Sequence, residues 1–212
     1  MKIYDYFRSS AAYRLRIALT LKGLSAERHF IHLRRREQSA PDYLAVNPMG
    51  LVPALETGGR TLTQSLAIIE YLDETHPDPA LLPRDPLDRA WVRSLALAVA
   101  CDIHPVNNLR ILNHLRDALG QDEAARNGWY AHWVAEGFRG LEAMLAGDDR
   151  VGAFCFGDAP TVADICLVPQ VFNAERMNCP LDDYPTIRRI AAAARALPAF
   201  QAAEPGRQPD AE

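Results

Sequence analysis

Hydroxyl and guanidinium side chains are concentrated in one short segment near the start of the chain. The run from Arg8 to Arg14 reads Arg-Ser-Ser-Ala-Ala-Tyr-Arg and contains no cysteine. A serine hydroxyl can donate a hydrogen bond to a bound thiolate and so lower the pKa of that thiol. If thiolate chemistry occurs at this segment, the sulfur must therefore come from a bound molecule. The alternative interpretation is that Ser9 and Ser10 only cap the helix that follows.

Two later segments have features of a peptide-binding site. Val52-Pro53 stands before a predicted strand, where proline is normally excluded unless the bond is special. If that bond is cis, a point the sequence leaves open, the Val52 amide and carbonyl turn outward and can pair with the main chain of a bound peptide. Gln64-Ser65 opens a predicted helix, whose free N–H groups suit a carboxylate. Together these features predict a receptor for a small acidic peptide.

The elements that must position these residues alternate between strands and helices. The periodicity and turn signals predict strands over 2–7, 26–33, 52–56 and 60–63, and helices over 11–22, 41–46 and 66–75. Ser9 or Ser10 is the natural N-cap of the first helix, and Ser65 is the expected N-cap of the last. This order fits a thioredoxin-like α/β domain over residues 1–80.

The composition of the chain changes after the proline-rich link at 77–86. Ala- and Leu-rich patterns predict helices near 87–119, 122–146, 162–176 and 185–196, with a capping box at Thr161-x-x-Asp164. The fold class is therefore α/β plus all-α, with an all-helical domain over 87–212. The polar residues after Ala202 are expected to be a poorly ordered end.

Composition excludes several classes of protein. The chain has 212 residues, 49% of them hydrophobic, and a formal net charge of -4, which argues against global disorder and against a nucleic-acid binder. The longest apolar run, 95–101, is far shorter than the roughly 20 residues of a membrane span, and no secretory signal precedes it. We therefore expect a cytoplasmic protein that needs neither a membrane nor nucleic acid. Its four isolated cysteines predict free thiols and no metal site.

Motifs spread over essentially the whole chain carry a family resemblance. They are the segments 6–19, 47–55 and 64–72, Gly157-Asp158, 161–164, 167–170, 173–176 and 184–187. Jointly these motifs are highly specific, and they resemble the zeta class of glutathione transferases, which includes maleylacetoacetate isomerase. The resemblance implies an N-terminal thioredoxin-like domain, a C-terminal helical bundle, a homodimer and glutathione as the cofactor.

The resemblance also implies roles for individual residues. Ser9 and Ser10 would lie at the glutathione sulfur, with Ser9 as the thiolate partner. The implied glutathione-binding residues are Ser9, Ser10, Gln38, Val52, Pro53, Gln64, Ser65, His104, Asn108 and Arg110. His104 before Pro105 has an alternative interpretation as a satisfied histidine at a helix end. One departure is Ala11, where family members often carry cysteine, and it puts in doubt the conversion of halogenated acids sometimes seen in the class.

The substrate implied by the family is a small dicarboxylate. Maleylpyruvate and maleylacetoacetate each carry two carboxylates flanking a conjugated cis double bond, so their binding requires separate cations. Arg8, Arg110 and Arg176 are the candidates, with Ser9, Ser10 and Arg8 expected at the chemistry; Arg176 could instead be a surface ion-pair residue. His104 and Arg110 resemble bacterial maleylpyruvate isomerases more than animal maleylacetoacetate isomerases, which tend to have Gln and Ser there.

The implied reaction is glutathione-dependent cis–trans isomerisation of a maleyl keto acid to its fumaryl isomer. Two other functions stay open. The first is a transferase that conjugates glutathione to electrophiles, which a roomy apolar second site without arginines would favour. The second is a glutathione-binding module without enzymatic activity, which loss of the serines would have favoured. The sequence does not distinguish maleylpyruvate from maleylacetoacetate as substrate.

Overall fold

Strand β1 (Lys2–Asp5) lies inside a four-stranded sheet of order β2-β1-β3-β4. In the computed structural model, which describes all residues 1–212, β1 pairs in parallel with β2 (Glu27–Phe30) and antiparallel with β3 (Ala54–Thr57). Strand β4 (Arg60–Thr63) joins β3 through a hairpin. Gly58 and Gly59 form its two-residue loop, and both have the positive φ that such a turn requires.

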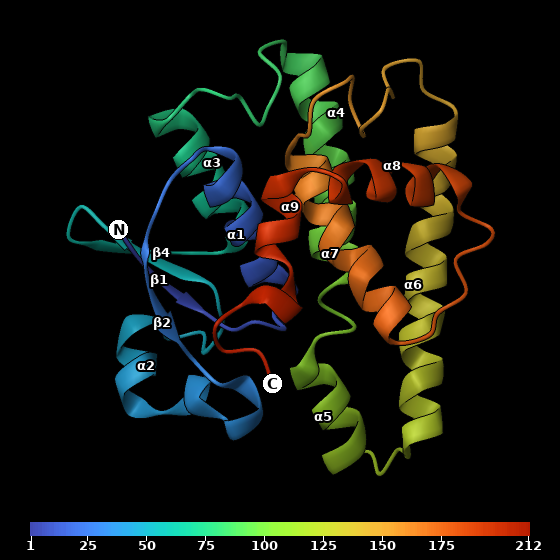
Figure 1. Cartoon of the computed structure of the whole chain (residues 1–212). Helices are drawn as coiled ribbons and strands as arrows, with labels where there is room; N and C mark the ends of the chain where they lie inside the picture. The colour runs from blue at the N-terminus through green and yellow to red at the C-terminus, as the bar shows by residue number, and fades with distance from the viewer. The chain divides into compact units, whose positions relative to one another are not determined.

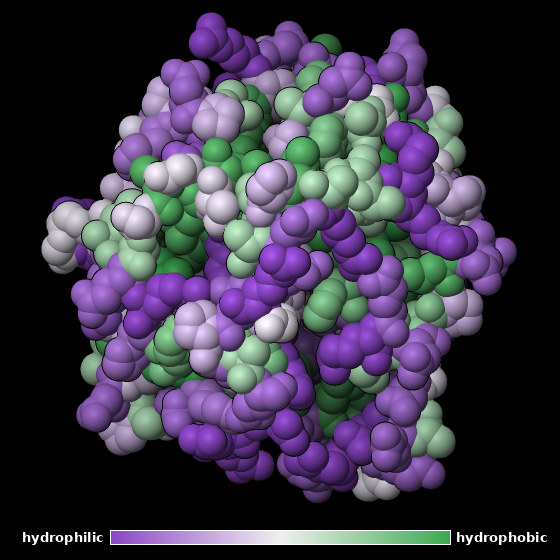
Figure 2. All heavy atoms as spheres, in the orientation of Figure 1, coloured by the Kyte–Doolittle hydropathy of each residue, from purple (hydrophilic) through white to green (hydrophobic).

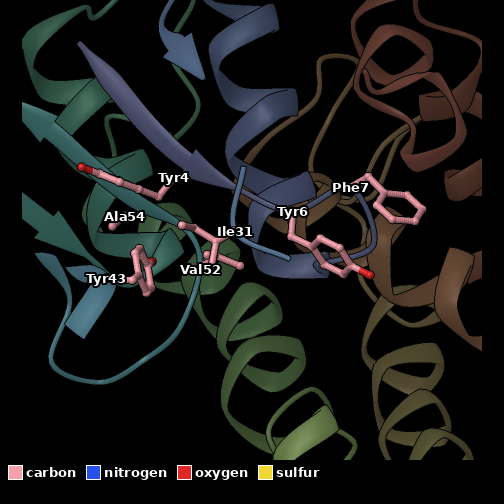
Figure 3. Close-up of a cluster of buried hydrophobic side chains, with 7 residues drawn as sticks. All are labelled: Tyr4, Tyr6, Phe7, Ile31, Tyr43, Val52 and Ala54. Atoms are coloured by element: carbon pink, nitrogen blue, oxygen red, sulfur yellow. The ribbon is translucent and has the colours of Figure 1, made fainter. Parts of the chain in front are cut away.

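The helices α1 (Ser10–Leu21) and α3 (Ser65–Thr75) pack against one another and against this sheet. Helix α1 also supplies the crossover that the parallel pairing of β1 and β2 needs. The core that joins these elements consists of Ile3, Leu15, Leu19, Leu55, Ile68 and Leu72. A second cluster surrounds the start of α1 and the short helix α2 (Pro41–Val46), and Figure 3 shows its members Tyr4, Tyr6, Phe7, Ile31, Tyr43, Val52 and Ala54.

Residues 196–212 belong to the same compact unit as residues 1–81, whereas the sequence assigned them to the helical domain over 87–212. Helix α9 (Pro198–Ala203) packs against α1, and its Phe200 side chain is fully buried. The expectation of a poorly ordered end after Ala202 is wrong. The Gln208 side chain is buried, and it accepts a hydrogen bond of 2.8 Å from Nη1 of Arg28. The polar residues of this segment are ordered because the first unit supplies their partners.

The second unit, residues 82–195, is all-helical (Figure 1). Its helices are α4 (Pro86–Leu97), α5 (Leu109–Asp117), α6 (Glu123–Ala146), α7 (Val162–Arg176) and α8 (Pro185–Arg195). The capping box predicted at the start of α7 is confirmed: Asp164 Oδ2 accepts from the Thr161 backbone N at 2.8 Å. The α/β plus all-α fold class, with a thioredoxin-like sheet domain and a helical bundle, is therefore confirmed.

The helix predicted over 87–119 is interrupted. A π-helical turn over Ala98–Ile103 follows α4, and irregular chain separates it from α5. The side chain of Ile103 fits against α6 at Gly137, where an added Cβ would lie 2.2 Å from Ile103 Cγ1. A glycine is therefore required for this close approach.

Hydrophilic and hydrophobic side chains both lie on the surface. The face in Figure 2 interleaves hydrophilic and hydrophobic residues. None of the helices combines the length and the apolar character that crossing a membrane would require.

Candidate functional site

Ser9 stands at the N-terminus of α1, as the sequence predicted. Its backbone is extended, and its Oγ accepts a hydrogen bond of 3.2 Å from the Ala12 N–H, so Ser9 is the N-cap. The Ser9 hydroxyl also lies 3.5 Å from the Val52 carbonyl oxygen, which it contacts as donor. Helix α1 has no acidic residue in its first turn. The hydroxyl is thus placed at the positive end of a helix dipole that favours an anion.

The segment that leads into Ser9 is held from two directions. The Phe7 backbone N–H donates to Oδ2 of Asp210 at 2.9 Å, and the Phe7 carbonyl accepts from Nη2 of Arg16 at 3.0 Å. Arg16 is itself buried and paired with Asp5 Oδ1 at 2.7 Å. Arg8 follows directly; it is exposed, with its guanidinium 5.0 Å from the centre of the Phe7 ring. Its charge is therefore available at the surface beside Ser9.

Val52 presents its main chain beside Ser9. The Val52-Pro53 peptide bond is cis, and the Val52 N–H donates to no acceptor in the chain. The loop before it is fixed by two donors on the Leu51 carbonyl, Tyr43 Oη at 2.6 Å and Asn47 Nδ2 at 2.7 Å. The arrangement leaves one backbone donor open next to the Ser9 hydroxyl. Such a donor suits the main chain of a bound peptide.

Gln38 lies in a short 3₁₀ turn, Glu37–Ser39, beside the same loop. Gly50, with a φ of 61°, allows this approach, because a Cβ there would lie 3.1 Å from the Gln38 carbonyl oxygen. The Gln38 Oε1 atom is buried and has no hydrogen-bond partner. An unpartnered buried amide is expected where a ligand completes the hydrogen bonds.

Gln64 and Ser65 form the N-terminus of α3, but not in the predicted way. Gln64 rather than Ser65 is the N-cap, it has a φ of 69°, and no side chain caps the helix. A positive φ at a non-glycine residue is strained and is concentrated at functional sites. Ser65 is the first helical residue, and its buried Oγ accepts from Nη1 of Arg14 at 3.4 Å. The expected cap failed because the Ser65 hydroxyl faces Arg14 rather than the helix's own N–H groups.

The expected residues of the second unit lie around α5 and α6. His104 follows the π-helical turn, and Asn108 is the N-cap of α5, where its Oδ1 accepts from the Arg110 N–H at 3.1 Å. The Arg110 side chain is exposed. Asn107 fixes this segment by donating to the Tyr130 carbonyl on α6 at 3.2 Å. Asn108 therefore has a structural role in the chain itself, and Arg110 presents a surface cation.

Arg176 ends α7 and is exposed, and it forms no ion pair. Its neighbour Glu175 is instead held by Arg195, whose two terminal nitrogens lie 2.9 and 2.8 Å from the carboxylate oxygens. The surface ion-pair interpretation of Arg176 is therefore wrong. Burial raises the pKa of the Tyr130 hydroxyl to about 12, with the Arg176 charge opposing the shift. Arg176 and the Asn107–Arg110 segment thus share Tyr130 as a neighbour.

Within the first unit, the structure joins the expected residues in two groups. Ser9 contacts Val52, with Gln38 beside the loop that carries Val52, while Ser65 contacts Arg14 at the α3 N-terminus. The open donors and acceptors of these groups fit a small peptide that carries a thiol and a carboxylate. The four cysteines are free, and three of them are buried.

Family models match both units. One described as the N-terminal domain of glutathione S-transferase matches residues 1–74, and one described as its C-terminal domain matches residues 123–202. The chain belongs to the glutathione S-transferase family. The resemblance to the zeta class drawn from the motifs is confirmed, because a structural relative of this glutathione S-transferase is described as a member of that class.

The relatives match over their whole length. A maleylpyruvate isomerase from a Ralstonia species is 51% identical over 210 residues, 99% of each chain. The holo structure of a maleylpyruvate isomerase, described as a bacterial glutathione S-transferase of the zeta class, matches with a TM-score of 0.98 at 50% identity over 100% of both chains. A maleylacetoacetate isomerase from Methylobacterium extorquens, with bound malonate and glutathione, gives 0.97 at 42% identity, again over 100% of both.

Several residues that shape this glutathione S-transferase site were missed in the sequence. Arg14 and Arg16 were visible as cations inside the apolar pattern of 13–19, which is a signal of buried, partnered charge. Asp210 gave no such signal, because its partner is a backbone N–H 203 residues away. The role of Asn47 in holding Leu51 could have been inferred from the Asn-Pro turn, since asparagine often bonds to nearby backbone groups.

Proposed function

We propose that this chain is a glutathione-dependent cis–trans isomerase that converts a maleyl keto acid, maleylpyruvate or maleylacetoacetate, to its fumaryl isomer. The observation that carries the proposal is the match of half of all residues, over 99% of the chain, to a maleylpyruvate isomerase. The site agrees with it. If thiolate chemistry occurs at the α1 N-terminus, where a serine hydroxyl stands without a neighbouring cysteine, the thiol must come from a bound molecule.

Glutathione, when bound, would supply a thiolate for reversible addition to the conjugated double bond, which makes that bond single and free to rotate until elimination of the thiolate restores it in the trans isomer. Ser9 has the chain's part in this chemistry: its hydroxyl, which makes only a long 3.5 Å contact with the Val52 carbonyl in the free chain, would rotate to donate its hydrogen bond to the sulfur instead. That bond favours the thiolate, together with the N–H groups of the first turn of α1. Ser10, the first residue of that turn, is the second proposed hydroxyl. Neither serine transfers its own proton permanently, so both are regenerated unchanged.

The remaining roles follow from the open groups described above. The Val52 N–H before Pro53 would pair with the cysteinyl main chain, Gln38 would bind the glycyl end, and the α3 N-terminus at Gln64 and Ser65 would bind the γ-glutamyl carboxylate. In the second unit, His104, Asn108 and Arg110 are the proposed glutathione-binding residues.

Arginines are the proposed binding groups for the dicarboxylate. Arg8, Arg110 and Arg176 are exposed and carry no carboxylate partner in the chain. Cations that hold the substrate carboxylates also stabilise the negative charge that develops on the conjugated carbonyl as the double bond is broken. That differential stabilisation of the transition state is what accelerates the step.

We also propose a homodimer in the cytoplasm. The dimer rests on the family to which the chain belongs. The four free cysteines fit a reducing compartment. Light scattering of the purified chain would test the dimer.

The function is tested by initial rates on maleylpyruvate and maleylacetoacetate, each with and without glutathione, beside a conjugation assay with a generic electrophile. We expect glutathione-dependent isomerisation, and a preference of orders of magnitude for one acid would identify the physiological substrate. Conjugation of the electrophile with neither acid isomerised would overturn the proposal. It would favour the transferase instead.

A further inference from the structure

Arg14 is a buried cation without a buried anion. Its side chain, from the second turn of α1, is 2% exposed, and its Nη1 donates to Ser65 Oγ at 3.4 Å. Its Nε and Nη2 atoms are buried and have no hydrogen-bond partner. No carboxylate in the chain pairs with it.

Arg16, two residues along the same helix, shows what a satisfied buried arginine looks like here. It is 4% exposed, and it pairs with Asp5 Oδ1 at 2.7 Å. It also donates to the carbonyls of Ala203 and Phe7, both at 3.0 Å. A buried charge is costly unless it is paired and hydrogen-bonded. The arrangement at Arg16 meets that requirement, and the arrangement at Arg14 does not.

The Arg14 guanidinium lies beside the N-terminus of α3, where it contacts Ser65. The first α-helical bond there runs from the Ile68 N–H to the Gln64 carbonyl, so the N–H groups of residues 65–67 precede it and lack helical acceptors. No side chain caps this end, and its first turn contains no acid. An uncompensated guanidinium and several open donors therefore act on the same small region.

We propose that Arg14 is a positioning residue that supplies, through the Ser65 hydroxyl, the positive charge for a carboxylate bound at the α3 N-terminus. The Ser65 oxygen accepts from Arg14, which leaves its own O–H to donate outward to the carboxylate. For the cofactor of the proposed function, on which this inference rests, the anion is the α-carboxylate of the γ-glutamyl residue. Arg14 does not touch the ligand.

The test compares two ligands rather than one. Glutathione and 4-aminobutyryl-cysteinyl-glycine, which lacks only that carboxylate, are titrated calorimetrically into the wild-type chain and into the variants R14Q, R14K and S65A. We expect R14Q to weaken glutathione binding by about tenfold to a hundredfold, the range for a hydrogen bond to a charged group. Binding of the analogue should change by less than about twofold.

Further variants separate electrostatics from structure. R14K keeps the charge and should keep most of the preference for glutathione. The double variant R14Q/S65A should lose no more of the preference for glutathione over the analogue than either single variant loses, because the Arg14 charge acts through Ser65. R60Q, which removes an exposed arginine of the same unit, is the charge-matched control and should leave both affinities unchanged.

The outcomes are distinguishable. If R14Q weakens both ligands equally, or neither, Arg14 is a structural residue and the inference is overturned while the proposed function stands. If the wild-type chain does not bind glutathione, the proposed function fails and takes the inference with it. Circular dichroism of each variant checks folding, and the charge-keeping R14K provides the comparison should R14Q not fold.

Discussion

The carboxylate of Asp210 accepts a hydrogen bond of 2.9 Å from the backbone N–H of Phe7, across 203 residues of sequence. Because Arg16 binds the carbonyl of the same residue, the Phe7 main chain is fixed on both sides, two positions before Ser9. The geometry of the Ser9 hydroxyl thus depends on a residue near the other end of the sequence.

We expect Asp210→Ala to raise amide exchange at Phe7 and to lower the free energy of unfolding by about 1–2 kcal/mol, the loss of one partly buried hydrogen bond. Hydrogen–deuterium exchange mass spectrometry of a peptide that spans Phe7 measures the amide exchange, and urea unfolding measures the free energy. Glu204→Gln is the control, because it removes only the exposed ion pair with Arg207. Unchanged exchange at Phe7 in Asp210→Ala would show that Arg16 alone holds the segment.

Ser9→Ala should lower kcat by about 10²–10³-fold, the loss expected when one donor to a developing or bound anion is removed. It should also raise the pKa of the bound glutathione thiol, which ultraviolet absorbance of the thiolate reports. Ser10→Ala, one residue further into α1, is the matched comparison and should have the smaller effect. Equal effects of the two variants would contradict the assignment of Ser9 as the main thiolate partner.

Arg176→Gln should raise the KM for the maleyl acid by about tenfold or more, because an arginine–carboxylate interaction is lost, while the KM for glutathione stays unchanged. Steady-state rates with each substrate varied in turn separate the two. Arg188→Gln removes another α-helical surface arginine, one already paired with Asp182 at 3.0 Å, and should leave both values unchanged. A normal KM for the acid in Arg176→Gln would remove Arg176 from the site.

Stability should fall in alkali because of two buried tyrosines. Burial raises the pKa of Tyr43 and of Tyr130 to about 12, from an ordinary value of 10.0. Between pH 10 and pH 12, each tyrosine hydroxyl has lost its proton in the unfolded chain but keeps it in the folded chain. The contribution of the two tyrosines to the free energy of unfolding is therefore fully present below pH 10 and declines as the pH rises toward 12.

The expected loss is about 1.4 kcal/mol per tyrosine at pH 11. Urea unfolding at neutral pH and at pH 11 measures it. Tyr130→Phe should show a smaller loss between the two conditions than the wild type, since phenylalanine has no proton to release. An identical pH dependence in Tyr130→Phe would mean that Tyr130 ionises normally in the folded chain.

Local patterns were enough to predict much of this fold. The N-cap at Ser9 and the capping box at Thr161 and Asp164 both depend on residues within a few positions of one another. Their hydrogen bonds are decided by short-range geometry, so sequence spacing predicts them.

The failures involve partners that are distant in sequence. Ser65 was assigned as a cap because its type favours that role, yet Arg14 on another helix competes for its oxygen. The long helix expected over 87–119 breaks where Ile103 packs against Gly137. The site residues of the first unit were found through motifs, whereas the partners of the buried Arg14 and Arg16, Ser65 and Asp5, are decided by tertiary packing.

The assignment of residues 196–212 to the first unit makes that unit discontinuous, with residues 82–195 inserted between its parts. A chain that emerges from the ribosome in order therefore exposes the sheet first but completes the helical unit before α9 is available to cover α1. The usual sequence of N-terminal domain first is reversed for the last steps. In the nascent sheet domain, the face of α1 that α9 covers therefore stays open to solvent until residues 198–203 have been synthesised.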